Sequence, residues 1–225
     1  GAYIVVVAQD GSDSQSGFEQ QLVLKFSELK PEETGEKAGR KAIRMLGAKS
    51  IASGRMPVIL EPYTASRLLG LLPAVFSGDA VLKGKSFWQG RAGQQVASSL
   101  LTIVDDGALP GQLGSAPFDG EGVATGKTVL LEKGILQGFL HNTFTANKLG
   151  VKPTGNGVRG SYKGTPEVGI TNFYLQNGTA SVQEIYRDIS KGLLVTELMG
   201  LHTANPITGD FSLGASGLLI ENGQL

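Results

Sequence analysis

Carboxylate side chains gather in segments that the sequence pattern predicts as loops. Aspartate and glutamate bind hard cations such as Ca²⁺, and they serve as general acids or bases. They are also common in turns, because an Asp side chain accepts hydrogen bonds from the backbone that follows it. The spacing does not match an EF-hand loop, so a catalytic or cation site and a turn-forming role both stay open. The residues concerned are Asp105, Asp106, Asp119, Glu121 and Asp210.

A glycine-rich segment at 155–160 has the spacing G-x-G-x-x-G of a dinucleotide-binding loop. Such a loop needs a strand before it and a helix after it, so that the pyrophosphate meets the helix N-terminus. Here Pro153 and Thr154 precede the segment, and a stretch rich in Gly and Pro follows it. We therefore expect a flexible loop in which Arg159 could contact a carboxylate or a peptide terminus.

Histidine and cysteine are scarce, and this excludes several kinds of site. The chain has 225 residues, no Cys and two histidines, His141 and His202. Disulfides, thiolate nucleophiles and Cys-based zinc sites are excluded, and two histidines cannot supply the three protein ligands of a typical catalytic zinc. Each histidine is expected to be an ordinary polar residue at the end of an element. No serine lies in a G-x-S-x-G elbow.

Charge and hydropathy narrow the range of partners. The chain has 20 basic and 20 acidic residues, a net charge of +0, which argues against nucleic acid as a direct partner. No apolar run approaches the roughly 20 residues needed to cross a bilayer, so we expect no membrane contact. The default expectation is a cytoplasmic protein.

The pattern of elements predicts an α+β fold with clustered antiparallel strands, hairpins, a few packed helices and Gly-rich loops. We expect strands at 3–9 and 18–29 joined by a polar loop, followed by a helix from Pro31 to a stop at Gly47. Three segments with a Gly after polar residues predict hairpins, at 130–136, 174–180 and 219–225. Ser181 and Glu184 form a capping box that opens a helix, which we expect to end at Gly192. Two domains are expected: 1–54, with the strand pair and linking helix, and 55–225.

Several longer phrases are more specific than these short motifs. They are Phe-Ser-Gly-Asp-Ala-Val at 76–81, Leu-Thr-Ile-Val-Asp-Asp-Gly at 101–107, Ser-Ala-Pro-Phe-Asp-Gly-Glu-Gly-Val at 115–123, Thr-Gly-Asn at 154–156, Thr-Asn at 171–172 and Asn-Pro-Ile-Thr-Gly-Asp-Phe-Ser at 205–212 with Ala-Ser-Gly-Leu-Leu-Ile-Glu-Asn-Gly at 215–223. In this order along the chain, the phrases resemble the TldD/PmbA family, once called modulators of DNA gyrase, and most closely its PmbA (TldE) branch. Relative to that family the N-terminal α/β domain and the final β segment are missing, so we expect the chain to be part of a longer protein whose C-terminal domain is incomplete.

The resemblance implies a zinc peptidase whose TldD-type subunit carries H-E-x-x-x-H on a helix and a Cys near its C-terminus. At the matching strand-then-helix position this chain has Glu61 and Ser66 in place of the histidines and Pro62 in place of the Glu. Serine is a poor zinc ligand and proline cannot act as a base. The resemblance therefore implies a subunit without catalytic residues or metal of its own, with zinc held only by a TldD-type partner.

On this interpretation the chain helps to form the substrate channel of a cytoplasmic peptidase. The implied partners are a TldD-type subunit and a peptide substrate, and a homodimer is also considered. Two alternatives stay open: a hydrolase with an unrecognised site on the acidic loops, and a regulatory protein that binds gyrase. The loop candidates, which could equally fix irregular backbone, are Asp105, Asp106, Asp119, Glu121, Asn156, Arg159, Thr171, Asn172, Asn205 and Asp210.

Overall fold

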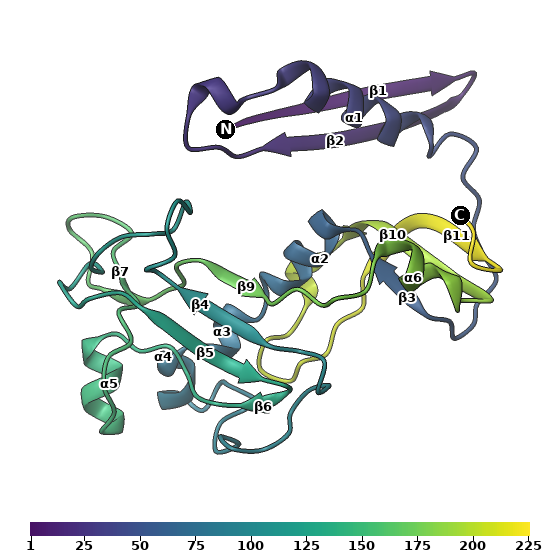
Figure 1. Ribbon diagram of the computed structural model, residues 1–225. Coiled ribbons are helices and arrows are strands. Elements are labelled where there is room, and N and C mark those ends of the chain that lie inside the picture. The colour runs from purple at the N-terminus through teal and green to yellow at the C-terminus, as the bar shows by residue number, and fades with distance from the viewer. The chain divides into compact units, whose positions relative to one another are not determined.

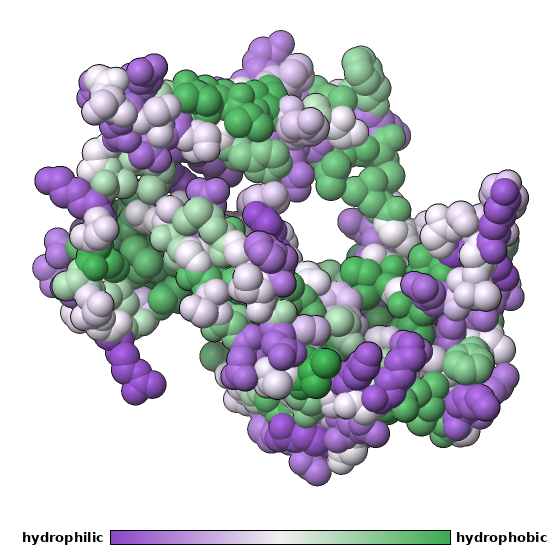
Figure 2. Space-filling view, turned by 180° about the vertical axis from the view of Figure 1, so that it is seen from behind, coloured by the Kyte–Doolittle hydropathy of each residue, from purple (hydrophilic) through white to green (hydrophobic).

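The computed structural model describes all 225 residues, and the chain divides into two compact units, Gly1–Arg55 and Met56–Leu225 (Figure 1). Both combine helices with mainly antiparallel strands, so the fold is α+β. No helix is long and apolar enough to span a membrane. Apolar residues, green in Figure 2, reach the surface among polar ones.

The smaller unit is a two-stranded antiparallel sheet with one helix on it. Its elements are β1 (Ala2–Asp10), β2 (Asp13–Gln21), the short 3₁₀ helix η1 (Phe26–Glu28) and α1 (Pro31–Ile43). Helix α1 begins at Pro31, as predicted, but it ends at Ile43, before the predicted stop. A turn then leads to Gly47, which has a left-handed φ of 73°. Its backbone lies directly on Gly17 of β2, where any Cβ would collide with the Ala38 carbonyl.

The predicted boundaries of the second strand are wrong. The polar segment 10–17 is predicted to be a loop, but β2 begins at Asp13 after a tight turn at Gly11 and Ser12. Residues 22–29 contain η1 instead of a strand. A hydropathy pattern does not reveal this strand, because its backbone pairs with β1 while Gly17 is the one residue of the nine that is buried.

The larger unit contains a four-stranded antiparallel sheet in the order β6-β5-β4-β9 and a three-stranded sheet in the order β11-β10-β3, where β3 is parallel to β10. A two-stranded ribbon, β7-β8, completes the strands. In chain order its elements are β3 (Val58–Leu60), α2 (Pro62–Leu69), α3 (Pro73–Phe76), α4 (Gly78–Leu82), β4 (Ile103–Asp106), β5 (Lys127–Glu132), β6 (Ile135–Leu136), α5 (Thr143–Leu149), β7 (Gly157–Val158), β8 (Glu167–Val168), β9 (Phe173–Leu175), α6 (Val182–Arg187), β10 (Lys191–Met199), the 3₁₀ helix η2 (Leu201–Thr203) and β11 (Gly214–Glu221).

The hydrophobic core lies between the four-stranded sheet and α3. Phe76 is fully buried, and its ring centroid is 5.0 Å from that of Trp88 and 6.0 Å from that of Phe173. Leu130 and Leu136 of the β5–β6 hairpin pack into the same cluster. Burial of this cluster anchors α3, and with it the loops at the end of β4.

Two of the three predicted hairpin turns form. Lys133 and Gly134 both have positive φ between β5 and β6, and Asn222 and Gly223 do so after β11, as type I′ turns require. The expected hairpin at 174–180 is wrong, because β9 pairs with β4 and the chain then runs on to α6. The Ser181–Glu184 capping box is present. Gly192 does not end that helix, since it lies in β10 close to the Pro57 carbonyl.

A tight contact joins α4 to the segment before α5. Gly78 donates its N–H to the Leu140 carbonyl at 2.8 Å, and Leu140 donates to the Phe76 carbonyl at 2.8 Å. A Cβ on Gly78 would lie 2.9 Å from the Leu140 oxygen and would overlap the His141 ring. The absence of a side chain at position 78 lets the two segments meet.

Replacing Gly78 with Ala is expected to destabilise the protein by about 1–3 kcal/mol, because the added methyl group overpacks the contact with His141. Urea denaturation measures the effect. Gly138→Ala is the matched control, because nothing lies within 4 Å of a Cβ there. Equal stability of the two variants would contradict the packing argument.

Candidate functional site

Asp105, at the end of β4, is the centre of a buried polar cluster. Its side chain is 1% exposed. Oδ1 accepts the Thr171 N–H at 2.8 Å, while Oδ2 accepts the Thr171 hydroxyl at 2.8 Å and the Asn156 amide at 2.7 Å. A carboxylate tolerates such burial only when donors replace its lost water. Here two loops supply those donors, so the carboxylate ties both of them to the sheet.

Asn156 extends the cluster and is itself 2% exposed. Its Nδ2 also donates to the Gly169 carbonyl at 3.0 Å, and its Oδ1 accepts the Thr154 hydroxyl at 2.6 Å. The Gly169 N–H donates back to the Asn156 carbonyl at 2.9 Å. The backbone on both sides of Ile170 is therefore fixed, through Gly169 by Asn156 and through Thr171 by Asp105.

Asp119 and Glu121 also accept hydrogen bonds from the backbone. Asp119 Oδ1 accepts the N–H groups of Glu121 and Val123 at 2.9 and 3.0 Å, and its Oδ2 accepts that of Gly157 at 2.7 Å. Glu121 Oε2 accepts the N–H of Thr143, in the first turn of α5, at 2.7 Å. Both carboxylates thus hold loop backbone in place.

Arg159, Asn172 and Asp106 are likewise engaged with loop backbone. Arg159 donates from Nε to the Gly120 carbonyl at 2.8 Å and from Nη1 to the Gly164 carbonyl at 2.9 Å. Asn172 donates to the Asp106 carbonyl at 2.7 Å, and Asp106 Oδ1 accepts the Ala108 N–H at 3.0 Å. The contact of Arg159 with an external carboxylate stays a prediction.

Eight of the ten loop candidates are thus linked by hydrogen bonds, either directly or through an adjacent residue. We call these eight residues the carboxylate network. Asn205 and Asp210 lie outside it, on the exposed loop between η2 and β11. Asn205 Oδ1 accepts the N–H groups of Ile207 and Thr208 at 2.9 and 3.3 Å, which shapes a turn. The network members are Asp105, Asp106, Asp119, Glu121, Asn156, Arg159, Thr171 and Asn172.

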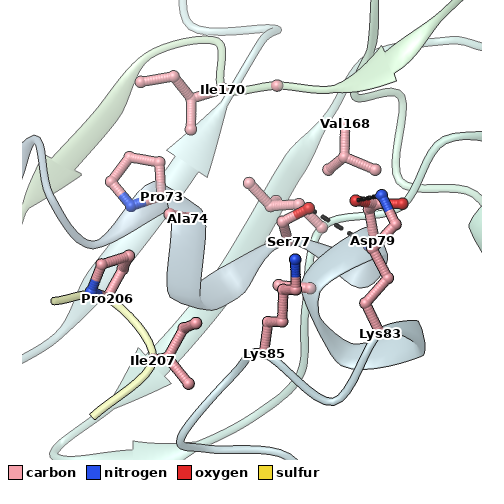
Figure 3. Close-up of a pocket in the computed structure, with 13 residues that line it drawn as sticks. Pro73, Ala74, Ser77, Asp79, Lys83, Lys85, Val168, Ile170, Pro206 and Ile207 are labelled. Carbon is pink, nitrogen blue, oxygen red and sulfur yellow. Dashed lines mark hydrogen bonds and ion pairs between the residues drawn. The ribbon is translucent and has the colours of Figure 1, made fainter. Parts of the chain in front are cut away.

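The sequence did not indicate a pocket of about 400 Å³ that lies beside this network. One wall is α3 and α4 with Ser77 between them, the second is the segment 168–170, and the third is Pro206 with Ile207 (Figure 3). The network fixes the second wall, and Asn205 shapes the loop of the third. The walls lie far apart in the chain, so no local motif marks the pocket.

The start of α2 carries the three positions at which the family resemblance leads us to expect a zinc-binding motif in a TldD-type chain. Glu61 precedes the first helical residue, Pro62 is that residue, and the Ser66 hydroxyl donates to the Tyr63 carbonyl at 2.7 Å. One carboxylate, a proline and a hydroxyl that is already bonded do not fit a zinc ion. No group of three or more His, Cys, Asp or Glu side chains placed to hold a metal occurs in the structure.

His141 is a buried residue next to Gly78, and its Nδ1 lies 3.3 Å from the Thr145 hydroxyl. Burial lowers the pKa of its imidazole below the ordinary value, because the charged form loses hydration. His202 lies apart in η2 and is exposed.

Comparison with known proteins adds the family context. Residues 53–225 match the profile of the PmbA/TldA metallopeptidase C-terminal domain. A Buchnera aphidicola protein named metalloprotease PmbA homolog is 33% identical over 224 residues, which cover 99% of this chain and 48% of that protein. The chain spans about half the length of the curated relatives it matches.

Solved structures agree with these matches. A Thermotoga maritima protein described as a candidate modulator of a DNA gyrase has a TM-score of 0.91 and 37% identity, covering 99% of this chain and 50% of that one. TldE from Thermococcus kodakarensis has a TM-score of 0.86 and 29% identity, covering 98% and 50%.

Asp105→Asn is expected to destabilise the protein by about 2–4 kcal/mol, because an amide NH₂ group would face the donors of Thr171 or Asn156 and leave buried groups unpaired. Urea denaturation gives the value. Asp210→Asn, on the exposed loop, is the control and should stay within about 0.5 kcal/mol of the parent. If the Asp105→Asn variant is as stable as the parent, the carboxylate does not hold the loops.

The lowered pKa of His141 predicts that stability falls as the pH drops below about 6.5, the value in the unfolded chain. The unfolded chain binds the proton first, so acid favours unfolding until the folded state is protonated too. Urea denaturation between pH 7 and 5 should therefore show a smaller loss of stability for His141→Gln than for the parent. The same slope in both proteins would disprove the assignment.

Proposed function

Since the chain belongs to the PmbA/TldD metallopeptidase family, we propose that it is a non-catalytic, PmbA/TldE-type subunit of a TldD/TldE-like peptidase in the cytoplasm. Its role is to hold peptide substrates for a TldD-type partner, which carries the zinc and cleaves the peptide. The observation that supports this most strongly is the start of α2, where Glu61, Pro62 and Ser66 do not fit a metal site.

The loop carboxylates support a holding role over a hydrolytic one. A general base must have a free lone pair within reach of the proton that it removes. Asp105 and Asp119 each accept three hydrogen bonds from their own chain, and Glu121 holds the first turn of α5. Carboxylates engaged in this way favour a structural role, so the hydrolase alternative has the weaker support.

The pocket supports the binding of a peptide. Small-ligand sites are typically concave, mostly apolar and fitted with a few polar groups, with volumes of about 300–1,000 Å³. The pocket of about 400 Å³ has such a lining, and the carboxylate network fixes one of its walls. In this proposal the network supplies the rigidity that lets the subunit hold an extended peptide in one register.

The full chain, purified alone, is expected to contain no stoichiometric zinc and to hydrolyse no peptide, while addition of a TldD-type subunit brings both zinc and peptidase activity. Metal analysis by mass spectrometry and a peptidase assay measure the two properties. Ser66→Ala is a control that should leave the activity of the complex unchanged, because the hydroxyl bonds only to a helix carbonyl.

Stoichiometric zinc together with peptide hydrolysis by the isolated chain would refute the proposal. Co-purification with gyrase, in place of a TldD-type subunit, would favour the regulatory alternative. The net charge of +0 argues against direct contact with DNA in that case, because nucleic-acid binding usually draws on an excess of basic residues.

A further inference from the structure

The pocket beside the carboxylate network contains a cation that has no anionic partner. Lys83 at the rim pairs with Asp79 at 2.7 Å, but no carboxylate lies within ion-pair distance of Lys85. In Figure 3 the Lys85 ammonium points toward Ser77. The charged groups that line the pocket therefore leave one uncompensated positive charge, which favours an anionic group on whatever binds there.

Ser77 adds a hydroxyl donor to the lining of the same pocket. Its Oγ accepts the Asp79 N–H at 3.2 Å, and no acceptor in the chain takes its proton. A carboxylate has two oxygens, so an ammonium and a hydroxyl can each bind one of them. The pair therefore favours a carboxylate over a group with a single acceptor.

The wall formed by Ile170 offers backbone groups as well. Neither the N–H nor the C=O of Ile170 has a hydrogen-bond partner, although both neighbours are fixed by the network. Free backbone groups held in a fixed position can pair with an extended peptide, as in strand addition. The bound molecule is thus expected to carry peptide groups near its carboxylate.

The remaining surface is apolar. Pro73, Ala74, Val168, Ile170, Pro206 and Ile207 line the pocket around the two polar donors (Figure 3). A bound carboxylate must therefore stand beside an apolar group. The last residue of a peptide has both on one carbon, whereas an Asp or Glu side chain brings its carboxylate on a methylene stem without a branching apolar group.

We infer that this pocket binds the free C-terminal carboxylate of a peptide that ends in an apolar residue. Lys85 and Ser77 contact the carboxylate, the apolar walls take the last side chain, and the backbone of Ile170 pairs with the peptide before it. The inference rests on the proposed holding function and gives it a substrate class, namely peptides with an accessible apolar C-terminus.

Fluorescence anisotropy on the full chain without a partner subunit tests this inference. The probes are a labelled hexapeptide that ends in Val-Leu with a free carboxylate, the same peptide amidated, and an amidated version with Glu before the final Leu. We expect the free acid to bind roughly tenfold more tightly than either amide, because a charged hydrogen bond is lost in both. Equal affinity of acid and amide would overturn the inference, and tight binding of the Glu peptide would assign the site to acidic side chains.

Lys85→Met removes the charge but keeps an unbranched apolar stem at an exposed position, so the variant is expected to fold. It should weaken binding of the free acid roughly tenfold, to the level of the amide, and leave binding of the amide unchanged. Lys127→Met, an exposed lysine on β5, is the matched control and should change neither. Equal losses in the two variants would mean non-specific attraction and would overturn the inference.

The experiments distinguish a refuted carboxylate pocket from a refuted proposed function. If acid and amide bind alike while the chain still activates a TldD-type subunit, the carboxylate pocket is refuted and the holding function stands. If the isolated chain contains zinc and cleaves peptides, the proposed function is refuted whatever the anisotropy shows.

Discussion

The buried carboxylate of Asp105 is the interaction on which the loops of the larger unit depend. Burying an ionised group costs several kcal/mol unless hydrogen bonds replace its hydration. Three donors from Thr171 and Asn156 meet that requirement, and they come from segments far from β4 in sequence. The hydrogen bonds that one buried carboxylate requires therefore hold together loops that have few apolar residues to pack against each other.

The two walls of the pocket are held by different interactions. Asp105 and Asn156 face inward and hold the backbone at Gly169 and Thr171, so Ile170 between them is rigid without being hydrogen bonded. On the opposite wall the hydrophobic contacts of Phe76 anchor α3. A rigid polar wall and a rigid apolar wall reduce the conformational entropy that ligand binding must overcome.

Local structure could be predicted from the sequence where a few neighbouring residues determine it. The Ser181–Glu184 capping box, the start of α1 at Pro31 and the turn at Gly134 all depend on such local rules. The start of β2 and the missing hairpin at 174–180 depend on which strand pairs with which, and local pattern does not encode that. The carboxylates and Arg159 of the network were candidates from their residue types in predicted loops, and Asn156, Thr171 and Asn172 came from phrases that resemble a family. Their grouping and the pocket required the fold.

The contact between Gly78 and His141 links two positions that are 63 residues apart in the sequence. The imidazole occupies the space that a side chain at 78 would fill. A smaller residue at 141 would relieve only part of this overlap, because a Cβ at 78 would still lie 2.9 Å from the backbone oxygen of Leu140. In a divergent set of such chains, position 78 is expected to stay glycine even where the residue at 141 changes.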